Sequence, residues 1–220
     1  VGLTFLSGLL GTGHHYYYIG VNKIWLIVGG IFSALEPLAF LAMALFAVYM
    51  YRKGEKSHPN KIALFWTIGA SIVSFVGAGL LGFAHTLPQT NIYTHGTLVT
   101  AMHGHYAFWG AYAMIVLAII SYAMPNMTGR KLYDSTRGHM AFWLSNVGML
   151  GMTVAFGVAG VAQVYLERKM KMDFMDVQNE ISIHFVVLLL CASLFATGIT
   201  LYILEFIKYG KPTDEALIKE

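Results

Sequence analysis

Five long apolar stretches constrain the fold of this 220-residue chain more than any other feature of its sequence. They cover approximately residues 24–51, 62–84, 97–124, 140–166 and 183–207. Each contains at least the roughly 20 residues that an α-helix needs to cross a hydrocarbon core about 30 Å thick. Residues 1–10 look like the end of a sixth stretch. We therefore predict an all-α, polytopic transmembrane helix bundle with five complete helices and the end of a sixth.

The composition supports an integral membrane protein that contacts the lipid bilayer. Hydrophobic residues make up 57% of the chain and charged residues only 11%, whereas about a quarter of the residues in a typical soluble domain are charged. No basic amphipathic stretch with interleaved aromatics is present, so we expect no nucleic-acid partner. Without repeats or low-complexity segments, residues 1–220 are predicted to form one membrane domain. The chain starts without Met or a positively charged segment, and we expect it to be part of a longer protein.

Lysine and arginine residues in the connections predict the orientation, because they are enriched on the cytoplasmic side of membrane proteins. With five crossings, one side carries Lys23, Arg168, Lys169 and Lys171. The other side carries Arg52, Lys53, Lys56, Lys61, Arg130, Lys131, Arg137, Lys208, Lys211 and Lys219. The side with more basic residues is predicted to be cytoplasmic, which places the connections at 11–23 and 85–96 on the outer face.

His103 and His105 are separated by one glycine in the third stretch, which contains no Asp, Glu, Lys or Arg. On a helix, residues two apart point roughly 200° apart, so these imidazoles cannot readily bind one metal together. They can bind two different centres, one on each side. Both lie roughly 10–14 Å from the outer end of the helix, a depth that suits a haem whose acidic groups reach the interface. Hydrogen-bonded packing histidines are the alternative, although ionisable groups inside a membrane usually mark a functional site.

His14 and His15 are adjacent in a connection that contains glycines and can turn both imidazoles towards one metal. Glu36 is the only carboxylate of the first stretch and lies roughly 20 Å along the helix from Lys23. A carboxylate at that depth needs a cation, a metal or a proton. We predict that His14, His15, Glu36 and His103 converge on one site. The alternatives are an exposed histidine pair and a protonated glutamate bonded to a neighbouring helix.

Two other patterns are less specific. Gly77, Gly79 and Gly82 have the spacing of a dinucleotide-binding loop, but they lie inside a membrane stretch without a βαβ unit. Close helix packing is the better interpretation. His85 and His95 flank the second outer connection; they could help to anchor cofactor carboxylates or could be ordinary interfacial residues.

Together these motifs resemble the cytochrome b subunit of bacterial nitric oxide reductases, which belongs to the haem-copper oxidase superfamily. The resemblance extends through essentially all 220 residues, which are similar to the C-terminal half of the family's twelve-helix subunit. The motifs that carry it, in the family's order, are Gly11–Tyr17, Gly30–Pro37, Gly82–Pro88, Tyr93–Thr97 and His103–His105.

The resemblance implies a role for each candidate residue. His14 and His15 would bind a non-haem iron, and His103 would be the axial ligand of a high-spin haem b3 that faces it. His105 would be an axial ligand of a low-spin haem b. Glu36 would be an iron ligand or a nearby acid that handles protons. The family reaction converts two NO, two electrons and two protons to N2O and water in denitrification, with the metal sites towards the periplasmic side of the bacterial inner membrane.

The resemblance also implies components outside this sequence. The family's third iron-binding histidine and the second axial ligand of haem b belong to helices upstream of Val1. The sequence Glu36-Pro37-Leu38 is more similar to the cytochrome c-dependent type than to the quinol-dependent type. A membrane-anchored cytochrome c subunit is therefore the expected partner and electron donor. Two alternatives are an oxygen-reducing haem-copper terminal oxidase subunit and a transporter whose buried His and Glu residues relay protons.

Overall fold

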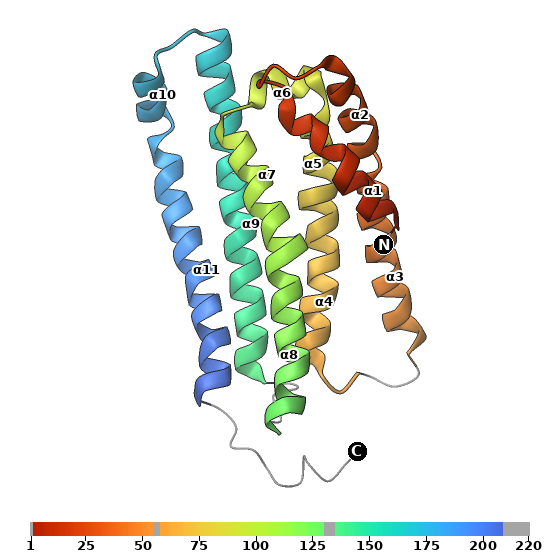
Figure 1. Ribbon diagram of the computed structural model, residues 1–220. Helices are drawn as coiled ribbons and strands as arrows, with labels where there is room; N and C mark the ends of the chain where they lie inside the picture. Colours follow the sequence, from red (N-terminus) through yellow and green to blue (C-terminus); the bar gives the residue numbers. More distant parts are fainter. Residues whose placement is uncertain (1, 55–57, 130–134, 209–220) are drawn as a thin grey trace.

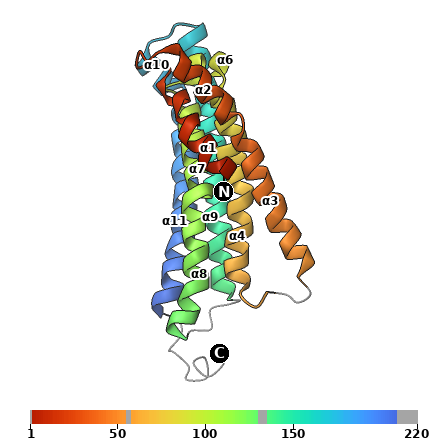
Figure 2. The same ribbon diagram turned by 45° about the vertical axis from the view of Figure 1, so that its right-hand side comes forward.

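The computed structural model describes residues 2–54, 58–129 and 135–208, and every regular element within these ranges is helical. The long helices run side by side along one axis (Figures 1 and 2). Those long and apolar enough to cross a membrane are Lys23–Lys53, Lys61–Thr86, Leu98–Thr128, Thr136–Lys169 and Ser182–Ile207. The predicted all-α transmembrane bundle is thus confirmed, and the predicted ends of the spans differ from these by at most four residues.

Most spans consist of more than one element. The first comprises α2 (Lys23–Ser33) and α3 (Glu36–Lys53), and the second comprises α4 (Lys61–Ser74), the π-helix η2 (Phe75–Leu81) and α5 (Gly82–Thr86). The third comprises α7 (Leu98–Phe108), the π-helix η3 (Trp109–Ala113) and α8 (Met114–Thr128). The last two are α9 (Thr136–Val164) with the π-helix η4 (Tyr165–Lys169), and α11 (Ser182–Lys208). The shorter elements are α1 (Gly2–Gly11), the 3-10 helix η1 (Thr12–Tyr16), α6 (Pro88–Thr94) and α10 (Phe174–Glu180).

The first span is interrupted where the sequence predicts one continuous helix. Ala34 and Leu35 form a turn between α2 and α3, directly before Glu36 and Pro37. Proline has no backbone N–H and is well accommodated in the first turn of a helix, so a new helix starts at this point. Glu36 therefore lies at the N-terminus of α3, where the helix dipole favours negative charge.

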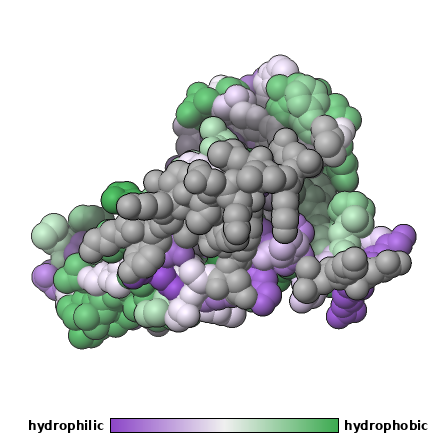
Figure 3. Space-filling model, turned by 90° about the horizontal axis from the view of Figure 1, so that it is seen from below, coloured by the Kyte–Doolittle hydropathy of each residue, from purple (hydrophilic) through white to green (hydrophobic). Residues whose placement is uncertain are grey.

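The two ends of the bundle differ in the residues they present. The connection between α1 and α2 lies at the same end as α6 and α10, at the top of Figure 1. This end therefore holds the two connections at 11–23 and 85–96. α4 and α9 begin at the opposite end, where the end-on view shows hydrophilic residues beside hydrophobic ones on the flanks (Figure 3).

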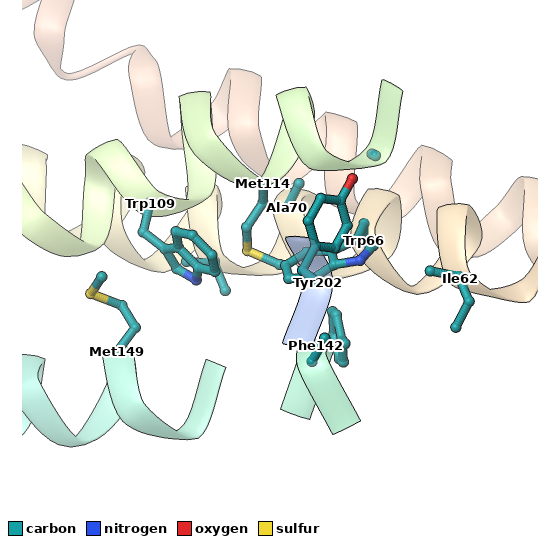
Figure 4. Packing of buried hydrophobic residues seen from close by; sticks show 11 residues of the cluster. Ile62, Trp66, Ala70, Trp109, Met114, Phe142, Met149 and Tyr202 are labelled. Atoms are coloured by element: carbon teal, nitrogen blue, oxygen red, sulfur yellow. The ribbon is translucent and has the colours of Figure 1, made fainter. Parts of the chain in front are cut away.

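Trp66 on α4 is fully buried and forms the centre of the aromatic core (Figure 4). Its ring meets Phe142 of α9 and Tyr202 of α11 edge-on, with ring centroids 5.1 and 5.6 Å apart. Trp109 of η3 contacts it from the other side at 6.0 Å, and Met114 of α8 is equally buried. Side chains from four spans thus pack together here, which fixes the position of the helix that carries His103 and His105.

Glycines allow η1, which carries His14 and His15, to lie directly on α2. A Cβ atom at Gly29 would lie 2.5 Å from the Cα atom of Gly13, and a Cβ atom at Gly13 would meet the backbone carbonyl of Trp25. Backbone therefore packs on backbone at this contact, which no residue with a side chain could reproduce.

We expect the substitution Gly29→Ala to destabilise the full-length protein by about 1–3 kcal/mol or more, because the new methyl group meets backbone atoms that cannot move aside. Gly30→Ala is the matched control, since a Cβ atom there meets nothing within 4 Å. Thermal unfolding in detergent measures both variants. Equal melting temperatures for the two would contradict the proposed backbone contact.

Candidate metal and cofactor site

His14 is held in one tautomer by its hydrogen bonds. Its Nδ1 lies 2.6 Å from the carbonyl oxygen of Gly11 and 2.6 Å from the hydroxyl of Ser33. A carbonyl oxygen can only accept a hydrogen bond, so these partners assign the proton to Nδ1. The Nε2 atom then keeps its lone pair, which is the form in which imidazole binds a metal.

The environment also keeps the histidine pair neutral. Burial, together with charge repulsion from His15, His103 and His85, lowers the pKa of His14 to about 4. Burial also lowers the pKa of His15, whose ring centroid lies 4.0 Å from that of His14. Four imidazoles therefore share one electrostatic neighbourhood, in which His14 and His15 favour the neutral, metal-binding form.

The carboxyl group of Glu36 lies close to Gly11, the residue whose carbonyl oxygen accepts from His14. A Cβ atom at Gly11 would lie 2.8 Å from the Ser33 hydroxyl oxygen and 3.4 Å from a carboxyl oxygen of Glu36. Glu36 is half-buried at the start of α3. His14, Ser33 and Glu36 are thus gathered around the last residue of α1, from three different elements.

His103 lies on the side of α7 that faces η2 and α5. Its Nδ1–H donates to the carbonyl of Gly77, 3.0 Å away, and its ring stacks on that of His85 with centroids 5.0 Å apart. A Cβ atom at Gly82 would lie 3.2 Å from Cε1 of His103, and one at Gly77 would lie 2.7 Å from the backbone nitrogen of Ala107. These two glycines therefore serve close helix packing against α7. As at His14, the carbonyl partner leaves Nε2 free.

His105 lies in a different environment from His103. Its Nδ1–H donates to the carbonyl of Ala101, 2.8 Å away in its own helix, which again leaves Nε2 free. Its ring contacts Phe156 of α9 at 4.9 Å between centroids. Together with Gly104 and Trp109 it lines a pocket of about 580 Å³ between α7, α9 and α11. The imidazoles of His103 and His105 thus lie in separate environments.

Sequence reasoning missed two features of this site. Ser33 is fully buried, and its only signal in the sequence is a hydroxyl group within an apolar stretch. For His85 the sequence left open an anchor for cofactor carboxylates or an ordinary interfacial residue, and it did not predict that this side chain is 7% exposed and stacked on His103. Within the described residues its Nε2 has no hydrogen-bond partner. His95 follows α6, and its ring lies tilted against that of Tyr18, with centroids 4.2 Å apart.

Two imidazoles alone do not complete a metal site. In residues 2–54, 58–129 and 135–208, no three His, Cys, Asp or Glu side chains are grouped so that they could hold one metal ion. A metal bound by His14 and His15 would need further donors from outside these residues.

The sequence of this chain is similar to those of known proteins. The chain matches the family described as cytochrome C and quinol oxidase polypeptide I over residues 1–197. It is 42% identical, over 96% of its length, to one subunit of the nitric oxide reductase of Stutzerimonas stutzeri. It covers 46% of that relative and thus spans about half its length. A stretch comprising 39% of the chain is 33% identical to 15% of cytochrome c oxidase subunit 1 of Corynebacterium diphtheriae.

We expect Gly82→Ala to disturb the ring of His103, because the added methyl group would lie 3.2 Å from its Cε1 atom. If His103 binds a haem, the absorption spectrum of the purified full-length protein should show a shifted or weakened Soret band. Gly8→Ala is the control, since a Cβ atom there meets nothing within 4 Å. Identical spectra for the two variants would contradict the expected effect of the Gly82 contact on a haem bound by His103.

Proposed function

Since this chain belongs to the cytochrome c and quinol oxidase polypeptide I family, within the haem-copper oxidase superfamily, we propose that it is the C-terminal part of a nitric oxide reductase catalytic subunit. The complete subunit would reduce two NO molecules to N2O and water with two electrons and two protons, in denitrification. One observation carries this proposal: α7 presents His103 to the neighbourhood of His14 and His15, and His105 to a separate pocket.

The residues fit the cofactors of such an enzyme. His14 and His15 would hold a non-haem iron, His103 would be the axial ligand of haem b3, and His105 an axial ligand of haem b. The Nε2 atoms of His14, His103 and His105 are available for metal binding, because each Nδ1–H donates to a backbone carbonyl. When bound, the two irons of the catalytic centre would supply electrons and polarise NO as charge develops on the forming N–N unit.

The chain's own residues would position the reactants and handle protons. η1 and α7 would hold the two metal-binding surfaces in fixed relation, so that two NO molecules meet in proximity. The Glu36 carboxyl group, half-buried at the N-terminus of α3 beside Gly11, is placed to hold a proton close to this centre. The reaction consumes two protons, and we infer that Glu36 either delivers them or binds the iron.

We also propose how the protein sits in its membrane. It is a multi-pass membrane protein, and the larger number of Lys and Arg residues in the connections at the other end supports placement of the metal sites towards the periplasm. The partner would be a membrane-anchored cytochrome c subunit that supplies electrons to haem b.

Oxygen reduction is the second candidate function, because part of the chain is similar to a cytochrome c oxidase subunit 1. Metal content and substrate preference of the purified full-length protein separate the two functions. Iron without copper, together with rapid NO consumption, is the expected result. Copper in the centre and a preference for O2 would overturn the proposal in favour of an oxidase.

Replacing each histidine of α7 should remove a different haem. We expect His103→Ala to abolish the high-spin haem signal and His105→Ala the low-spin signal, whereas the control His184→Ala, at the start of α11, keeps both. Optical and EPR spectra of the full-length protein measure this. A protein whose spectrum does not respond to either substitution would instead be consistent with a proton-relaying transporter.

We expect Glu36→Gln to lower NO reduction by about 100-fold or more, because general acid–base groups contribute about 10²–10⁴ in rate. Glutamine keeps the size of the side chain, so the haem spectra should be unchanged. Glu180→Gln, at an exposed position on α10, serves as the control. Normal turnover of the Glu36 variant would show that this carboxyl group is only a packing element.

A further inference from the structure

Ser33 occupies an unusual position for a hydroxyl group in a transmembrane helix. It is the last residue of α2 and is 0% exposed. Its hydroxyl oxygen lies 3.1 Å from the carbonyl of Gly11 and 2.6 Å from Nδ1 of His14. A serine inside a helix commonly bonds a carbonyl of its own preceding turn, whereas these two partners lie 22 and 19 residues away in the chain.

The directions of these hydrogen bonds follow from their chemistry. The carbonyl oxygen of Gly11 can only accept, so the Ser33 hydroxyl donates its proton there. The remaining lone pairs of the hydroxyl then accept from Nδ1–H of His14, which also donates to Gly11. The Nδ1 edge of the imidazole therefore rests on two acceptors from two different elements, which restricts rotation of the ring.

The packing leaves little freedom for this arrangement to change. A Cβ atom at Gly11 would lie 2.8 Å from the Ser33 hydroxyl, so the close approach of α1 to α2 depends on that glycine. The contact also ties the ring of His14 to the helix end from which the chain turns into α3 and Glu36. A movement of that turn would therefore be transmitted to the imidazole.

We propose that Ser33 is a positioning residue for metal binding: its hydroxyl fixes the orientation of the His14 ring, whose tautomer the Gly11 carbonyl sets, so that Nε2 points to the iron. This inference rests on the proposed role of His14 as an iron ligand. Partners of this kind orient the ligand and raise its basicity, and their loss typically lowers metal affinity by about 10–100-fold.

Ser33→Ala in the full-length protein tests the proposal, with Ser145→Ala as the matched control. Ser145 is also 0% exposed, but its hydroxyl bonds the carbonyl of Ala141 in its own helix, α9, and is unconnected to His14. The measurements are non-haem iron per protein and the apparent iron affinity in a titration with an iron chelator. The low-spin haem spectrum, which reports the His105 site, shows that each variant is folded.

The expected result is a loss of iron affinity of about 10–100-fold in Ser33→Ala, with unchanged affinity in Ser145→Ala and an intact low-spin spectrum in both. Unchanged iron affinity in Ser33→Ala would overturn the inference and leave the proposed function standing. Equal losses in the two serine variants, or loss of the low-spin haem along with the iron, would also overturn it, since both show a general packing effect. A wild-type protein without non-haem iron would overturn the proposed function itself.

Discussion

The candidate site depends on hydrogen bonds from histidine Nδ1 atoms to backbone carbonyls. His14, His103 and His105 each make one, and each bond assigns the ring proton and leaves Nε2 available. Because a carbonyl cannot donate, the tautomer does not depend on a titratable neighbour. In an apolar environment such bonds are also strong, since no water competes for the donor. The main chain therefore leaves the Nε2 atoms of these imidazoles available for the metals of the proposed enzyme.

Close backbone packing makes these bonds possible between elements. His103 reaches a carbonyl of η2 because Gly77 allows that π-helix to approach Ala107 closely. η1 rests on α2 because Gly13 and Gly29 leave room for direct contact. In membranes, where lipid is as apolar as leucine, small residues and van der Waals contact hold helices together. The glycines thus have a structural role, and the chemistry of the site follows from the contacts that they allow.

Hydropathy was enough to predict the spans, because about 20 apolar residues in a helix cross a bilayer whatever their tertiary contacts. The helical spacing of His103 and His105 similarly predicts two directions from a single helix. Ser33 was not predictable, since its role depends on Gly11 and His14, which only the packing of α1 on α2 brings close. The π-helices were not predictable for a different reason. A single-residue bulge in a stretch that is apolar throughout leaves no mark in the sequence pattern.

These π-helices lie next to the residues that the site uses. In η2 and η3 the backbone hydrogen-bond pattern shifts from four residues to five, which changes the direction in which carbonyls and side chains point. The carbonyl that bonds His103 belongs to Gly77 in η2, and η3 begins directly after α7. η3 also packs against the second span, since a Cβ atom at Gly110 would lie 2.6 Å from the backbone nitrogen of Ser74, the last residue of α4. These local departures from α-helical geometry therefore help to set the contacts of α7, and with them the neighbours that each of its two histidines faces.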